Sequence, residues 1–198
     1  MEPSATTGIA RISRIFAWLG GLLVLVAALL ISLDVLTRNI LGSTFFESFE
    51  LGSYAFAACV ALGMSYALTS KAHIRIEVVY SLFPRRFRVV LDVMAIMFLA
   101  VAASVLAWFA AQTVYDSYSI GAHSNTTLAV PLVLPQGLWL AGLGWFALTT
   151  VWLAASSLLH LSHGRPDLVL REIGVPALQE EILQSSTDAN LAPIDIVS

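Results

Sequence analysis

Four stretches of the chain are apolar over about the length of a membrane-spanning helix, and more polar segments separate them. The stretches are Ile15–Thr37, Phe49–Thr69, Val89–Val114 and Leu138–Leu161. A helix rises about 1.5 Å per residue, so about 20 apolar residues cross a hydrocarbon core of about 30 Å. The pattern therefore predicts an all-α membrane protein with four transmembrane helices.

The composition agrees with a membrane protein. Charged residues make up 12% of the chain, against about 25% in a soluble domain, and the mean hydropathy is +0.83. The single cysteine, Cys59, can form no intramolecular disulfide. We expect residues 1–14 to be a cytoplasmic N-terminal lead-in, 15–162 the four-helix transmembrane domain, and 163–198 a partly disordered cytoplasmic tail.

Basic residues flank the predicted spans on one side of the membrane almost exclusively. The flanks and connections expected on that side hold nine of the ten: Arg11, Arg14, Lys71, Arg75, Arg85, Arg86, Arg88, Arg165 and Arg171. Only Arg38 falls on the other side. Because short cytoplasmic segments retain Lys and Arg, this asymmetry predicts that both termini and the second connection are cytoplasmic.

Two segments have the character of short helices lying in the cytoplasmic interface. Ile9–Phe16 mixes two arginines with bulky apolar residues, as an amphipathic interfacial helix does. In the connection after the second span, His73, Arg75 and Glu77 alternate with isoleucines. An unpaired strand beside lipid would leave backbone groups unsatisfied, so a short interfacial helix is favoured there. We predict that these three residues fix that helix; the alternative is that they are solvated loop charges.

Small residues recur at every fourth position of the second span: Ser53, Ala57, Ala61 and Ser65. Small side chains on one helix face allow the backbone of a neighbouring helix to approach closely. This face is a candidate contact surface for another subunit. Alanine and serine are also common on membrane helices, so contact with lipid is the alternative.

Charged residues mark the outer edges of the first two spans. The connection between these spans is short, so we predict an ion pair between Arg38 and Glu50 that braces them. Asp34 is a competing partner for Arg38 because it lies one helical turn before it. Glu47 is better explained by a capping box with Thr44 at the start of the second span.

The sequence offers little for catalysis or cofactor binding. Haem ligation between helices needs histidines inside the bundle, whereas His73, His123, His160 and His163 all fall outside the spans or at their ends. Ion conduction normally leaves ionisable residues within the membrane, and here the acidic residues lie at span edges or outside. No phosphate loop, metal cluster or nucleophile arrangement is recognisable. We therefore expect a non-enzymatic accessory bundle without cofactors.

The order of these features resembles the small permease subunit of tripartite ATP-independent periplasmic (TRAP) transporters. The resemblance covers roughly Ile15 to Leu161 and rests on motifs that are weak singly and more specific in their order. They are Arg38 after the first span, Glu50-Leu51 opening the second, Lys71-Ala-His-Ile-Arg-Ile-Glu77, and Thr126-Thr127 followed by Pro131, Pro135 and Trp139. One departure is Glu77, where an aspartate is often expected.

The resemblance implies a multi-pass subunit of the bacterial inner membrane. Such a subunit scaffolds a large membrane subunit that carries substrate with sodium, while a soluble periplasmic protein delivers the substrate, commonly an organic acid. The expected partners are thus the large membrane subunit, the periplasmic substrate-binding protein and membrane lipids, with no nucleic acid.

Two other classes of protein share some of these features. A membrane anchor subunit of a redox enzyme complex is also a small accessory bundle, and the missing mid-span histidines count only against one that binds haem. A stand-alone small exporter or channel would transport without a partner. The sequence does not identify a substrate in any of these cases.

Overall fold

The structure is a computed structural model that describes residues 4–42, 48–70, 84–126 and 128–163. These residues contain α1 (Ser4–Leu41), α2 (Ser48–Thr69), α4 (Arg85–Ser119) and α5 (Val133–Ser162). All four helices are long and apolar enough to cross a membrane. This confirms the all-α class and the four predicted spans.

The helices extend beyond the apolar stretches in the sequence. α1 is continuous from Ser4, so the predicted lead-in Ile9–Phe16 belongs to the same helix as the first span. No proline interrupts that segment, and extending an existing helix is easier than starting a new one. α4 begins directly after Pro84, and α5 carries Pro135 in its first turn. Proline is tolerated at both places because the first backbone N–H groups of a helix have no partner within it.

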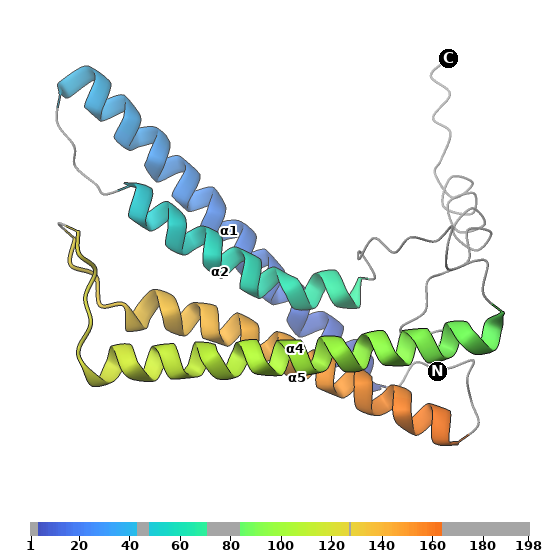
Figure 1. Ribbon diagram of the computed structural model, residues 1–198. Coiled ribbons are helices and arrows are strands. Elements are labelled where there is room, and N and C mark those ends of the chain that lie inside the picture. The colour runs from blue at the N-terminus through green and yellow to red at the C-terminus, as the bar shows by residue number, and fades with distance from the viewer. Residues whose placement is uncertain (1–3, 43–47, 71–83, 127, 164–198) are drawn as a thin grey trace, which may run out of the picture.

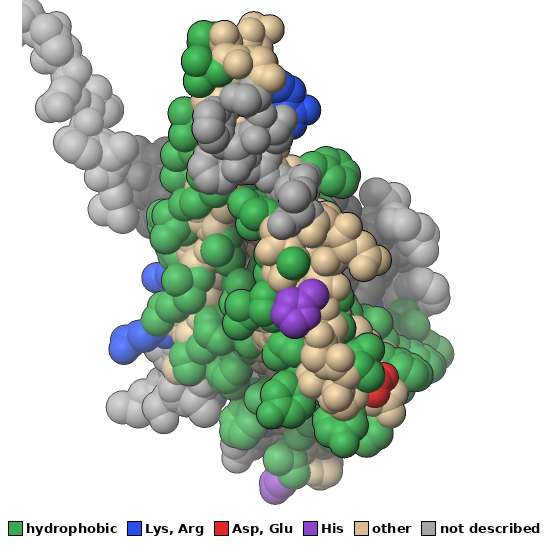
Figure 2. Space-filling view, turned by 90° about the vertical axis from the view of Figure 1, so that its left-hand side faces the viewer, with side chains coloured by type: hydrophobic (Ala, Val, Ile, Leu, Met, Phe, Trp, Pro, Cys, Tyr) green, Lys and Arg blue, Asp and Glu red, His purple; other side chains and the backbone are tan. Residues whose placement is uncertain are grey.

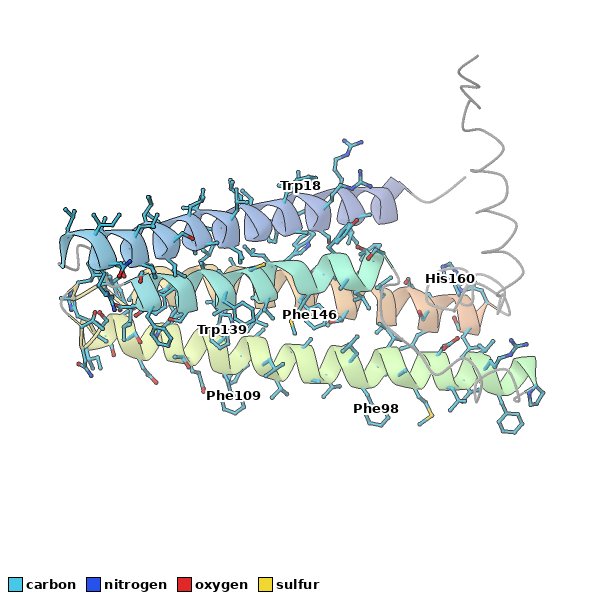
Figure 3. All side chains as sticks on the ribbon, turned by 90° about the horizontal axis from the view of Figure 1, so that it is seen from above. Trp18, Phe98, Phe109, Trp139, Phe146 and His160 are labelled. Atoms are coloured by element: carbon cyan, nitrogen blue, oxygen red, sulfur yellow. The ribbon has the colours of Figure 1, made fainter. Side chains whose placement is uncertain are left out.

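The helices lie in the order α1, α2, α5, α4, which differs from their order in the chain. The extensive contacts are those of α1 with α2, α2 with α5, and α5 with α4. α2 and α5 therefore form the middle of the molecule, while α1 and α4 lie on opposite outer sides (Figures 1 and 3). The spans thus form two hairpins, α1–α2 and α4–α5, joined through α2 and α5.

The two ends of the molecule differ in which helices begin and end there. α1 and α4 end, and α2 and α5 begin, at what we call the connection end (Figure 1). α1 begins and α5 ends at the opposite, terminal end. Seen from the connection end, hydrophobic side chains are interspersed with uncharged polar side chains and backbone, and few charged side chains are visible (Figure 2).

Small residues let α2 and α5 approach closely. A Cβ atom added at Gly142 of α5 would lie 2.6 Å from the carbonyl carbon of Ala61 and 2.7 Å from the nitrogen of Leu62, both in the α2 backbone. Ala61 and Leu143 also pack against Ala110 of α4, and all three are buried. This is the small-residue packing by which membrane helices associate.

Large apolar side chains point mainly outward. Trp18 of α1 is 76% exposed, and Phe98 and Phe109 of α4 are 70% and 60% exposed. In Figure 3 they project from the two outer sides, whereas Phe146 lies between the helices. Lipid tails are as apolar as these side chains, so exposing them costs little in a bilayer.

Candidate functional site

Polar side chains gather at the connection end, and Asp34 of α1 is the most buried of them. It is only 1% exposed. Its Oδ2 atom accepts a hydrogen bond of 2.7 Å from the Ser48 hydroxyl and one of 3.0 Å from Arg38 Nη2. Oδ1 has no hydrogen-bond partner in the part of the chain that the structure describes. Asp34 therefore ties the end of α1 to the first residue of α2.

Arg38 forms an ion pair with Asp34. The predicted ion pair of Arg38 with Glu50 is not formed. The Arg38 side chain is 60% exposed, and the 3.0 Å pair spans one turn of α1. Ser48 and Glu50 are two positions apart on α2, so their side chains point in different directions. Because Ser48 faces α1, Glu50 faces away from α1. The structure thus favours the competing partner, Asp34, which sequence spacing had left open.

Glu50 instead binds hydroxyl groups. Its Oε1 atom accepts a hydrogen bond of 2.6 Å from Tyr54 Oη, one turn further along α2. Its Oε2 atom accepts a hydrogen bond from the hydroxyl of Thr126, in the connection between α4 and α5. Glu50 is 8% exposed. It therefore joins the α1–α2 hairpin to the α4–α5 connection.

The described residues of the connection between α4 and α5, 120–126 and 128–132, form hydrogen bonds among themselves. Ser124 N donates to Val130 O at 2.9 Å, and Val130 N donates to Ser124 Oγ at 3.1 Å. Leu132 N donates to Ala122 O at 3.0 Å. Ser124 Oγ also lies 2.9 Å from Thr126 Oγ1. These bonds position Thr126 opposite Glu50, an arrangement that the sequence did not predict.

The small-residue ladder of α2 divides between two environments. Ala61 and Ser65 are buried, at 1% and 0% exposure, whereas Ser53 and Ala57 are exposed. Each four-residue step rotates the side chain by about 40°, because a helix has about 3.6 residues per turn. Over twelve residues the ladder turns by about 120°. Its second half is therefore used within the chain, and only its first half is open to a partner.

The outer side of α1 carries a continuous apolar stripe. Its members recur every three or four residues and are all more than half exposed: Trp18, Leu22, Leu25, Leu29, Leu33, Leu36 and Ile40. On a soluble protein such a surface marks an interaction site. On a membrane helix it faces lipid or another membrane helix.

The outer surface of α4 has a shallow hollow of about 540 Å³. Its lining residues are Trp108, Ala111, Gln112, Tyr115 and Asp116. All five belong to one helix, so the hollow opens outward and does not lie between the spans.

Several predicted sites fall outside the described residues. These are the interfacial motif His73, Arg75 and Glu77, and the capping box of Thr44 and Glu47. Within the described segments, no group of three His, Cys, Asp or Glu side chains could hold a metal ion. The absence of a cofactor remains a prediction.

The helices and their outward apolar faces define a multi-pass helical membrane protein. Comparison with known families identifies which one. The family model described as "Tripartite ATP-independent periplasmic transporters, DctQ component" matches residues 27–161, and the chain belongs to this family. A comparison with curated protein sequences gives no match. The family membership confirms the resemblance to a TRAP small permease subunit, and nothing found supports the redox-anchor alternative.

Proposed function

We propose that this chain is a non-catalytic scaffold that braces the large membrane subunit of a TRAP transporter. The observation that carries the proposal is the family match over residues 27–161, which includes most of the four spans. In this role the chain would transport nothing alone. The large subunit would carry an organic acid with sodium, and a soluble periplasmic protein would deliver the substrate.

The packing of the spans supports an accessory role. Small residues and hydroxyl-bearing side chains occupy the contacts of α2 with its neighbours, while α1 and α4 present large apolar side chains outward. A subunit with two broad apolar sides can lie against a larger membrane protein without losing contacts of its own. The hollow on α4 is open on its outer side, which suits a surface better than an enclosed substrate site.

We further propose that the chain lies in the bacterial inner membrane with both termini cytoplasmic. Nine of the ten basic residues fall, in the sequence, in the flanks and connections that this orientation makes cytoplasmic, which supports it. The connection end, with the Asp34 and Glu50 clusters, would then face the periplasm. The interfacial role of His73, Arg75 and Glu77 belongs to the same proposal, on the cytoplasmic side.

The exposed half of the α2 ladder is our proposed contact with the large subunit. Ser53 and Ala57 remain open after the chain has packed its own helices. Small side chains there would admit a partner helix closely.

Co-purification of the large membrane subunit with this chain tests the proposal. The unsubstituted chain should recover the large subunit in a fixed ratio, and Ala57→Leu should lower that recovery because the backbones can no longer approach. Ala155→Leu, at an exposed alanine of α5, is the matched control. Full recovery with Ala57→Leu would move the contact to another face. Failure of the unsubstituted chain to recover the large subunit would overturn the accessory role.

A further inference from the structure

The two hairpins of the molecule come into close backbone contact in the middle of the spans. There, Gly142 of α5 lies against the backbone of Ala61 and Leu62 in α2. Met64, Trp139 and Leu140 pack against Ala61, Ala110 and Leu143 in the same region, so side-chain packing also holds the middle of the two hairpins together. The ends of the hairpins lie further from this crossing and need contacts of their own.

On the terminal side of the crossing, such a contact comes from Trp145, one turn further along α5. Its indole Nε1–H donates a 3.0 Å hydrogen bond to Ser13 Oγ of α1. Its ring also lies 5.8 Å from that of Phe16, centre to centre. Ser13 is fully buried. The terminal half of α1 is thereby fixed to the α4–α5 hairpin.

On the connection side, the hairpins separate toward their ends (Figure 1), and the bond from Thr126 to Glu50 links them. Glu50 is eleven residues, about 16 Å of helix, from Ala61. A swing of only about 10° around the crossing would move Glu50 by about 3 Å, enough to break a hydrogen bond. The bond from Thr126 to Glu50 is therefore sensitive to small changes in the angle between the hairpins on the connection side.

The groups that form the bond are held in position from both sides. Tyr54 Oη binds the other carboxylate oxygen of Glu50 at 2.6 Å, which orients the carboxylate. Ser124 lies 2.9 Å from Thr126 Oγ1 and is itself bonded to the backbone of Val130. Hydrogen bonds to an ionised acceptor are stronger than those between neutral groups.

We propose that Glu50 and Thr126 form a latch that sets the angle between the α1–α2 and α4–α5 hairpins on the connection side of the contact at Gly142. Releasing the latch lets the helices bend apart at the connection end, while the packing around Gly142 and the contact of Trp145 with α1 keep the terminal end closed. The latch is a property of this chain alone, so it goes beyond the proposed accessory role and its test is separate from that role.

Distance measurements between paired spin labels test the latch in the full chain, reconstituted in lipid nanodiscs with Cys59→Ala. One pair, at Asn39 and Ser119, reports on the connection end, where both residues are exposed. The other pair, at Ile12 and Phe98, lies on the terminal side of the crossing, where both side chains are exposed. Thr126→Val removes the hydroxyl at nearly constant volume. It should broaden the first distance distribution and shift its mean by several ångströms, and leave the second unchanged.

Two matched substitutions complete the design. Thr126→Ser keeps the hydroxyl and should restore the narrow distribution. Thr113→Val removes a hydroxyl that bonds only to its own helix, at Phe109 O, and should leave both pairs unchanged. A narrow first distribution in Thr126→Val would overturn the latch. Equal broadening of both pairs, or the same broadening in Thr113→Val, would also overturn it, because either result shows general loosening.

Discussion

The contact of α2 with α5 depends on Gly142 having no side chain, so Gly142→Ala should destabilise the protein. The new Cβ would meet backbone atoms at 2.6 and 2.7 Å, and backbone cannot turn aside as a flexible side chain can. Overpacking of this kind costs about 1–3 kcal/mol, and the severity of the clash places it near the upper value. Alanine regains about 0.5–1 kcal/mol in a helix relative to glycine. We therefore expect a net loss of about 2 kcal/mol in the free energy of unfolding.

Gly144 provides the matched control for this substitution. It lies two residues away in the same helix, and an added Cβ there meets nothing within 4 Å. Gly144→Ala should leave stability unchanged or raise it by about 0.5–1 kcal/mol. Reversible unfolding in mixed detergent micelles, followed by circular dichroism, measures both variants. Equal stability of the two variants would refute the close approach of α2 and α5.

Three further substitutions test contacts between other helices by the same unfolding measurement. Gly20→Leu should lower stability by about 3 kcal/mol because the side chain would enter the backbone of α2, whereas Gly21→Leu meets open space and should not. Trp145→Phe should cost about 0.5–1.5 kcal/mol through loss of its hydrogen bond to α1. Ser48→Ala should cost about 1.5–3 kcal/mol because it removes a donor to the buried Asp34 carboxylate. Ser53→Ala, which loses only a bond within its own helix, should stay within about 0.5 kcal/mol of the unsubstituted chain. Wild-type stability of Trp145→Phe or Ser48→Ala would contradict the corresponding contact.

The number and rough position of the spans could be predicted from the sequence because the bilayer imposes a length. An apolar stretch such as Val89–Val114 has no other common explanation than a membrane helix. The ends of the helices were less predictable. Polar residues such as those of Ser4–Gly8 continue a helix as readily as they end one once it has formed.

The partners of the charged residues could not be predicted from the sequence. Arg38 has two carboxylates within reach, and the choice depends on how α2 is rotated about its axis. The structure fixes that rotation, because the hydrogen bond from Ser48 to Asp34 shows which face of α2 lies against α1. Likewise, the bond between Glu50 and Thr126 joins residues 76 positions apart in the chain. The small-residue ladder of α2 does not lie on a single face, because side chains four residues apart are rotated progressively around the helix.

Transport by reconstituted components tests the central proposal most directly. Proteoliposomes that contain the large membrane subunit, this chain and the periplasmic binding protein should take up an organic acid in a sodium-dependent manner. Proteoliposomes with this chain as the sole membrane component should show no uptake, and omission of this chain should abolish or strongly reduce uptake by the others. Sodium-dependent uptake by this chain alone, or full uptake without it, would contradict the scaffold role.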